Sequence, residues 1–104
     1  LSVKQITDKT VNDDFFEAVN FLPENFVDLL FLDPPYNITK KFNSVKFSRK
    51  TITAYTDYLE KVIEAILPLL KKSASVYVCG DWRSSISIPL VLEKFFIVRN
   101  RITW

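Results

Sequence analysis

The amino-acid sequence predicts an α/β fold in which a mainly parallel sheet is flanked by helices. Segments with helical spacing of apolar residues alternate with short apolar runs typical of strands, in the order helix, strand, helix, strand, helix, strand. Strands that alternate with helices in this way are joined by crossovers and lie parallel in one sheet. With 104 residues, 48% of them hydrophobic and 25% charged, the chain fits one small globular domain or a piece of a larger one.

The first two elements lie before a proline-rich turn. Residues 13–22 are expected to form a helix, capped by Asp14 or one of the two polar residues before it and ended by Pro23. Residues 27–32 form an apolar run interrupted only by Asp28, which predicts a buried strand. The strand stops at the Asp-Pro-Pro sequence because proline has no N–H group for a sheet ladder.

The middle of the chain is expected to be a loop followed by a helix. Residues 37–50 are polar and basic, and we expect a long loop there. A second helix is predicted from Thr51 or Thr53 to Leu70, with one apolar face turned inward. Pro68 should kink or end this helix.

Three shorter elements complete the predicted order. Residues 75–79 are expected to form a second buried strand, closed by Gly80 and Asp81. A third helix is expected over residues 84–94, and the alternation of side chains over residues 96–104 predicts a third strand. Asp81, Trp82 and Arg83 should then lie at the same sheet edge as the end of the first strand. There Trp82 either lines a pocket or is a packed aromatic of the turn.

Composition excludes several kinds of site. The chain has no histidine and one cysteine, Cys79, which rules out Ser-His-Asp and Cys-His catalysis and a disulfide framework, and no metal site is expected. No stretch approaches the roughly 20 apolar residues of a membrane span, so no membrane association and a cytoplasmic location are expected. Gly80 is the only glycine, whereas α/β enzymes that bind a nucleotide cofactor usually have a Gly-rich turn. Either no such cofactor binds, or that turn lies on sequence not present here.

A polar tetrapeptide, Asp33, Pro34, Pro35 and Tyr36, follows the first predicted strand, at the edge where open α/β sheets bind ligands. An ionised Asp33 accepts hydrogen bonds from an exocyclic amino group, and the Pro34 carbonyl is placed to accept from the same group. Tyr36 offers a flat face for stacking against a base turned out of a duplex. The pattern indicates a clamp for an amino-bearing heterocycle that acts by positioning and electrostatics. A simple strand-terminating turn is the alternative.

The stretch FLPENFVDLLFLDPPYN, residues 21–37, resembles the region around the catalytic motif of S-adenosylmethionine-dependent amino-group DNA methyltransferases. The resemblance covers nearly all of the chain from Val11 on, and it is to the class in which the catalytic motif precedes the cofactor motif. It implies a partial Rossmann-like methyltransferase fold over residues 1–104, an apparently N-terminal catalytic fragment without the Gly-rich cofactor motif and the target-recognition region. This chain alone is therefore expected to be inactive.

The resemblance also implies roles for individual residues. Asp33, Pro34 and Tyr36 would hold the flipped base, and Asp33 would border the methyl donor. Asp14 falls where such enzymes place a carboxylate near the cofactor's adenosine, but Asp13 stands where the family has glycine, and a helix cap is the alternative role for Asp14.

The segment after the tetrapeptide is a candidate DNA-binding arm. It contains five basic residues within eleven positions that hold no acid, which suits contact with phosphates, although a solvated loop explains the charge as well. The candidate DNA-binding residues are Asn37, Lys40, Lys41, Lys46, Arg49 and Lys50.

The predicted function is site-specific transfer of a methyl group from S-adenosylmethionine to the amino nitrogen of a flipped base in double-stranded DNA. Adenine N6 is favoured because the aspartate form of the tetrapeptide resembles adenine enzymes. The alternatives are an N4-cytosine DNA enzyme, an RNA or protein methyltransferase, and a catalytically silent DNA-binding fragment. A cognate restriction endonuclease is a candidate partner. The recognised DNA sequence and the oligomeric state are not determined by the residues.

Overall fold

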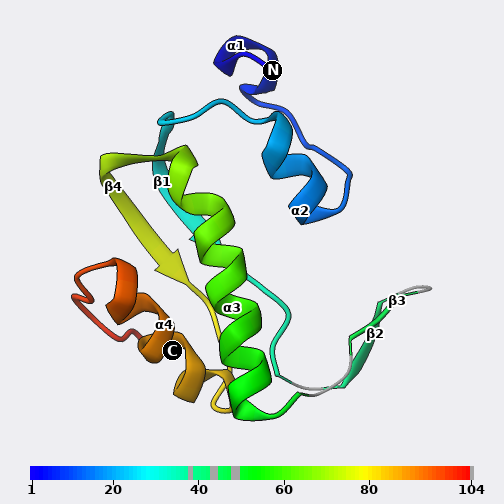
Figure 1. Ribbon diagram of the computed structural model, residues 1–104, viewed down its shortest axis with the longest axis vertical. Helices are drawn as coiled ribbons and strands as arrows, with labels where there is room; N and C mark the ends of the chain where they lie inside the picture. Colours follow the sequence, from blue (N-terminus) through cyan, green and yellow to red (C-terminus); the bar gives the residue numbers. More distant parts are fainter. Residues whose placement is uncertain (38, 43–44, 48–49, 104) are drawn as a thin grey trace. The chain divides into compact units, whose positions relative to one another are not determined.

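The computed structural model describes residues 1–37, 39–42, 45–47 and 50–103, and it divides into two compact units (Figure 1). The first unit comprises residues 1–32 and 61–77, and the second comprises residues 33–60 and 78–104. Helix α3 (Ile52–Ile66) contributes residues to both units.

The first unit opens with two short helices. Helix α1 (Val3–Ile6) was not predicted, and it begins with a capping box between Ser2 and Gln5. Helix α2 (Phe15–Ala18) begins after Asp14 and continues as a 3₁₀ helix (Val19–Phe21). The helix predicted over residues 13–22 is therefore confirmed in position, but only its first turn is α-helical.

Strands β1 (Val27–Leu32) and β4 (Leu70–Val78) form a parallel two-stranded sheet (Figure 1). The first strand has the predicted bounds, and the parallel pair with flanking helices confirms the α/β class. The second strand begins at Leu70 instead of residue 75. The expectation that both strands are buried was wrong, because Leu29 and Phe31 are 59% and 66% exposed. They alternate along β1 with the half-buried Leu30 and Leu32, so a single face of the strand is covered.

Helix α3 supplies most of the core. It begins after Thr51, whose hydroxyl accepts a hydrogen bond from the Ala54 N–H at 3.1 Å. It ends at Ile66 instead of Leu70, and a 3₁₀ helix (Leu67–Leu69) that contains Pro68 follows it, as the missing proline N–H requires. Its inward face is buried as predicted, through Tyr55, Leu59, Val62, Ile63 and Ile66.

The second unit contains a β-hairpin where a long loop was predicted. Strands β2 (Lys40–Phe42) and β3 (Val45–Phe47) pair antiparallel, with Lys40 opposite Phe47 and Phe42 opposite Val45. The loop prediction was wrong because it weighed the charge of the segment and overlooked the β propensity of Phe42, Val45 and Phe47.

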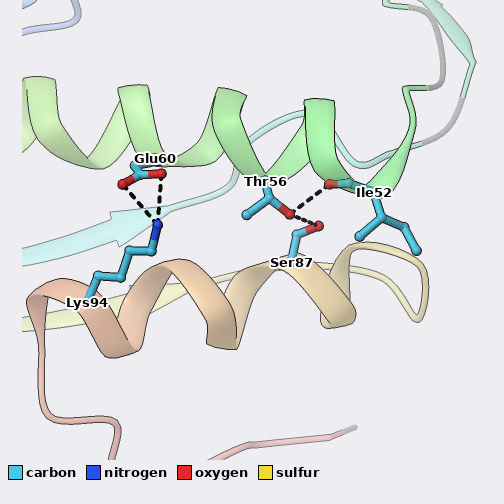
Figure 2. A network of polar contacts seen from close by, with 5 residues as sticks. All are labelled: Ile52, Thr56, Glu60, Ser87 and Lys94. Atoms are coloured by element: carbon cyan, nitrogen blue, oxygen red, sulfur yellow. Dashed lines mark hydrogen bonds and ion pairs between the residues drawn. The ribbon is translucent and has the colours of Figure 1, made fainter.

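Helix α4 (Ser87–Phe95) follows a 3₁₀ helix (Ser84–Ile86), which confirms the third predicted helix. Within the second unit, polar contacts join α4 to the first half of α3 (Figure 2). The Thr56 and Ser87 hydroxyls lie 2.9 Å apart, and the Lys94 ammonium lies 3.1 Å from both Glu60 carboxylate oxygens.

The third strand predicted over residues 96–104 is not observed. Residues 96–103 pair with no strand in the described part of the chain, and Ile97 and Ile102 are 77% and 66% exposed. Alternating side chains produce a strand only where a neighbouring strand supplies backbone donors and acceptors. Trp104 lies outside the described residues. Among the described helices, none combines the length and the apolar character that crossing a membrane requires.

Candidate active site

The Asp-Pro-Pro-Tyr turn directly follows β1 and lies in the second unit. Residues 33–36 belong to no helix or strand, as expected for a segment in which two prolines remove consecutive N–H donors. Asp33 is exposed, Pro34 is buried, and Pro35 and Tyr36 are half-buried. The turn therefore presents a carboxylate to solvent while its backbone is held inside the unit.

Tyr36 and Asp33 contact each other within the turn. The Tyr36 hydroxyl donates a hydrogen bond of 3.0 Å to Asp33 Oδ1. This bond, more than partial burial or the charge of Asp33, raises the pKa of Tyr36, because the phenol must stay protonated to donate. The contact leaves the second carboxylate oxygen of Asp33 facing away from this donor, so the carboxylate retains capacity for a further donor.

The backbone on both sides of Tyr36 is bonded to buried hydroxyl groups. The Tyr55 hydroxyl donates to the Pro35 carbonyl, and the Asn37 N–H donates to Ser84 Oγ at 3.0 Å. The Ser84 hydroxyl in turn lies 3.5 Å from the Tyr55 hydroxyl. Burial raises the pKa of Tyr55 and thereby keeps its phenol a donor, although the bond from Ser84 acts in the opposite direction. Sequence reasoning placed Tyr55 on the helix core face and Ser84 at a helix start, and it missed their contacts with the turn.

One signal could have revealed Tyr55. It lies on an otherwise apolar helix face, and a buried tyrosine hydroxyl needs a hydrogen-bond partner. Ser84 had no comparable signal, because its partner Asn37 is 47 residues away along the chain.

Asn37, the residue after the tetrapeptide, is 5% exposed. Its side-chain amide bonds to both backbone groups of Lys50, so these two residues bracket the β2–β3 hairpin. We predicted a DNA contact for Asn37, and that contact would require its buried side chain to become exposed. Lys40, Lys41 and Lys46 lie on the hairpin strands, and Arg49 lies outside the described residues.

The end of β4 lies beside the tetrapeptide, as the shared sheet edge predicts. The negative charge of Asp81 contributes to the raised pKa of Tyr36, after the hydrogen bond to Asp33 and partial burial. Burial acts to raise the pKa of Asp81, but hydrogen bonds from the Ser84 N–H and hydroxyl outweigh it, and the net pKa is lowered. The Ser84 N–H lies 2.9 Å from Asp81 Oδ1. Ser84 therefore connects the turns that follow the two strands.

Trp82 is 73% exposed, so the alternative of a packed aromatic was wrong. The Arg83 guanidinium lies 5.0 Å from the centroid of its ring, within the range of a cation–π contact. The lining of a pocket by Trp82 stays a prediction.

Gly80 does not provide a cradle for a nucleotide cofactor. A Cβ atom added there would lie 2.3 Å from Cδ1 of Ile88, so the space next to this backbone is filled by the protein itself. Because Gly80 is the only glycine of the chain, the residues present do not by themselves form the close backbone approach that a nucleotide cofactor needs.

Asp14 belongs to the first unit, where its carboxylate accepts hydrogen bonds from the N–H groups of Phe16 and Glu17 at 3.1 and 3.4 Å. It therefore caps α2, which is the alternative role named for it from the sequence. The cofactor contact of Asp14 stays a prediction.

The Asp-Pro-Pro-Tyr turn follows a strand of a parallel α/β pair, as expected from the resemblance of residues 21–37 to amino-group DNA methyltransferases. The chain belongs to the DNA methylase family, whose model matches residues 27–104. This match contains the tetrapeptide, α3, β4 and α4, and it confirms the family that residues 21–37 predicted.

Curated DNA methyltransferases are similar to the chain over nearly its whole length. It is 33% identical over 94 residues to the DNA adenine methyltransferase YhdJ of Escherichia coli strain K12. The aligned residues cover 90% of this chain and 32% of YhdJ. It is 32% identical over 115 residues to the type II methyltransferase M.BglII of Bacillus subtilis, which covers 97% and 30%. Identity with the type II methyltransferase M.BamHI of Bacillus amyloliquefaciens is 26% over 95 residues, which covers 91% and 22%. The chain spans a third or less of the length of these relatives.

Proposed function

We propose that the protein transfers a methyl group from S-adenosylmethionine to the exocyclic amino nitrogen of a flipped base in double-stranded DNA, with adenine N6 as the target. The single observation that carries this proposal is the exposed Asp33 carboxylate on a turn whose backbone is held by buried hydroxyl groups. Such a turn offers hydrogen-bond acceptors in a fixed position, which suits an amino group.

The two proline carbonyls of the turn differ in whether they already accept a hydrogen bond. The Pro35 carbonyl accepts from Tyr55, whereas no donor among the described residues is placed on the Pro34 carbonyl. Asp33 and the Pro34 carbonyl would each accept one N–H of the target amino group. The nitrogen lone pair then points away from both acceptors and toward the methyl group. As the nitrogen–carbon bond forms, the methyl–sulfur bond breaks to leave S-adenosylhomocysteine, and the amino nitrogen releases one proton to solvent.

Tyr36 would hold the base by stacking. Its hydroxyl is fixed on Asp33, which ties the orientation of the ring to that of the carboxylate. A base on the ring face would therefore meet Asp33 at its edge, which is the arrangement that recognition of an exocyclic amino group needs.

The methyl donor would be held only in part by this chain. S-adenosylmethionine supplies an electrophilic methyl group, and Asp33 is the residue of the turn that would border it. Asp14 is a second candidate contact, and its present role as the α2 cap would have to be compatible with that contact. No step of the proposal depends on Gly80.

DNA would be contacted by the hairpin that follows the turn. Lys40, Lys41, Lys46, Arg49 and Lys50 provide positive charge for phosphates around the extruded base. The bracket between Asn37 and Lys50 joins this segment to the tetrapeptide, so phosphate contact and base contact would be made by adjacent parts of one unit.

Two further features of the proposal draw on the relatives. Adenine as the target is supported by the similarity to YhdJ, a DNA adenine methyltransferase, and by the aspartate of the tetrapeptide. The type II designation of M.BglII and M.BamHI supports site-specific methylation and makes a cognate restriction endonuclease a candidate partner.

The test is methylation of unmethylated double-stranded DNA with isotope-labelled S-adenosylmethionine, using the gene product that contains residues 1–104. Mass spectrometry of the nucleosides should show N6-methyladenine, and N4-methylcytosine would overturn the choice of base. Asp33→Ala should abolish product formation with little change in thermal unfolding, because the side chain is exposed. Asp28→Ala is the matched control, since it removes an exposed aspartate whose ion pair with Lys71 is expected to contribute only about 0–1 kcal/mol. Activity that survived Asp33→Ala would contradict the proposed role.

A further inference from the structure

The hydroxyl groups of Tyr55 and Ser84 form a relay that joins the backbone on the two sides of Tyr36. The relay begins at the Asn37 N–H, which can only donate, and ends at the Pro35 carbonyl, which can only accept. Between them the Ser84 hydroxyl accepts from the Asn37 N–H, the Tyr55 hydroxyl donates to the Pro35 carbonyl, and the two hydroxyl oxygens lie 3.5 Å apart. The direction of the two end bonds is therefore determined, whereas the single hydrogen of Ser84 has both the Tyr55 hydroxyl and the Asp81 carboxylate as acceptors.

The relay is enclosed within the second unit. Tyr55 and Ser84 are both 0% exposed, and Asn37 is 5% exposed. The three residues come from α3, from the turn after β4 and from the end of the tetrapeptide segment. Because these groups are buried, loss of the Ser84 hydroxyl removes the partner of the Asn37 N–H, and loss of the Tyr55 hydroxyl removes the donor to the Pro35 carbonyl.

We propose that Tyr55 and Ser84 are positioning residues that hold the Tyr36 backbone and thereby place the Asp33 carboxylate, the Pro34 carbonyl and the Tyr36 ring for the target base. By bonding the Pro35 carbonyl, Tyr55 leaves the Pro34 carbonyl as the acceptor for the amino group. Neither hydroxyl touches the base. This inference rests on the proposed function where it is tested by the turnover number. Its test by hydrogen exchange of the Asn37 amide does not depend on that function.

The structure offers a matched control pair, of which one hydroxyl also lies on α3 and the other lies on α4, directly after the 3₁₀ helix that contains Ser84. The hydroxyl groups of Thr56 and Ser87 also join α3 to the segment after β4, and Ser87 is 1% exposed (Figure 2). The Thr56 hydroxyl bonds in addition to the Ile52 carbonyl of its own helix at 2.7 Å. Neither hydroxyl forms a hydrogen bond with residues 33–37, so loss of this pair should affect stability without affecting the turn.

The experiment compares Tyr55→Phe and Ser84→Ala with Thr56→Val and Ser87→Ala in the gene product that contains residues 1–104. The turnover number and the KM for DNA are measured at a temperature at which circular dichroism shows each variant folded. Tyr55→Phe and Ser84→Ala should lower the turnover number by about tenfold with little change in KM, the scale of one lost hydrogen bond in the transition state. The control variants should stay within about twofold of the wild type even where their melting temperatures fall.

Hydrogen exchange of the Asn37 amide is the readout that does not need methylation. Its exchange should accelerate in Ser84→Ala by about tenfold or more and should not change in Thr56→Val. A turnover number unaffected by Tyr55→Phe, or lowered equally by the control variants, would overturn the positioning role. An Asn37 amide that exchanged at the same rate in Ser84→Ala would refute the relay itself. If the wild type methylates no DNA while the Asn37 amide behaves as expected, the proposed function fails and the relay stands.

Discussion

The side-chain amide of Asn37 pairs with the backbone of Lys50 as one strand residue pairs with another. Its Nδ2 group donates to the Lys50 carbonyl at 3.0 Å, and its Oδ1 atom accepts from the Lys50 N–H at 2.8 Å. One buried side chain thus closes the segment that contains the basic hairpin, immediately after the tetrapeptide.

Asn37→Ala should loosen the hairpin. The variant leaves two backbone groups of Lys50 without these partners, which should lower the free energy of unfolding by about 1–3 kcal/mol. Amide hydrogen exchange in β2 and β3 should accelerate relative to that in α4. Asn20→Ala removes an exposed amide that bonds only one carbonyl, that of Phe16, and should change stability by less than about 1 kcal/mol. Equal effects of the two variants would show that the bracket has no special role.

Tyr36 should contribute to kcat/KM chiefly through its aromatic ring and less through its hydroxyl group. Tyr36→Phe removes the hydrogen bond to Asp33 and should lower kcat/KM by about three- to tenfold, the value of one exposed hydrogen bond. Tyr36→Ala should lower kcat/KM further, since loss of base stacking costs about 1–3 kcal/mol. Because the pKa of Tyr36 is raised, its phenol stays protonated at neutral pH, and the ratio of kcat/KM between the wild type and Tyr36→Phe should stay constant from pH 6 to pH 9. A phenylalanine variant as impaired as the alanine variant would contradict the stacking role.

Asp81 should make the free energy of unfolding depend on pH in the acidic range. The pKa of its carboxyl is lower in the folded chain than its ordinary value of 3.8. A carboxyl group whose pKa is lowered by folding stabilises the folded state at pH values above its pKa in the unfolded chain. This contribution is lost as the pH falls through its lower pKa in the folded chain. Asp81→Asn should therefore unfold more easily at pH 7, by about 1 kcal/mol, and should differ little from the wild type at the acid end. Urea titrations from pH 7 to pH 2 measure this, with the exposed Asp57→Asn as control. A difference that persisted or grew in acid would have the wrong sign.

A glycine should be required at position 80 for full stability, because the Ile88 side chain occupies the space that a Cβ atom at this position would need. In Gly80→Ala the new methyl group would lie 2.3 Å from Ile88 Cδ1, so the isoleucine must change its rotamer. The expected loss of stability is about 1–3 kcal/mol. Ile88→Val removes the conflicting atom and should recover part of this loss when combined with Gly80→Ala, although alone it costs about 0.5–1.5 kcal/mol. Additive losses in the double variant, measured by chemical denaturation, would exclude this contact as the cause.

Local features were readable from the sequence wherever the physical cause lies within a few residues. The strand over residues 27–32, the helix start at Thr51 and the helix end before Pro68 follow from apolar spacing, a capping hydroxyl and a missing N–H group. The tetrapeptide was identified in the same way, and the resemblance of residues 21–37 around it predicted the family that the family model confirms.

Features that depend on distant partners were not readable in this way. The alternation over residues 96–104 predicted a strand, but residues 96–103 pair with no strand in the part of the chain that the structure describes. The charge of residues 37–50 led us to expect a loop where a hairpin forms. The partners of the Tyr36 backbone lie on α3 and after β4, and a sequence cannot show which buried hydroxyl groups meet there. The sequence by itself determined the tetrapeptide and the chemistry it offers. Only the tertiary structure decided how that turn is held, because hydrogen bonds such as that between Asn37 and Ser84 join residues 47 positions apart.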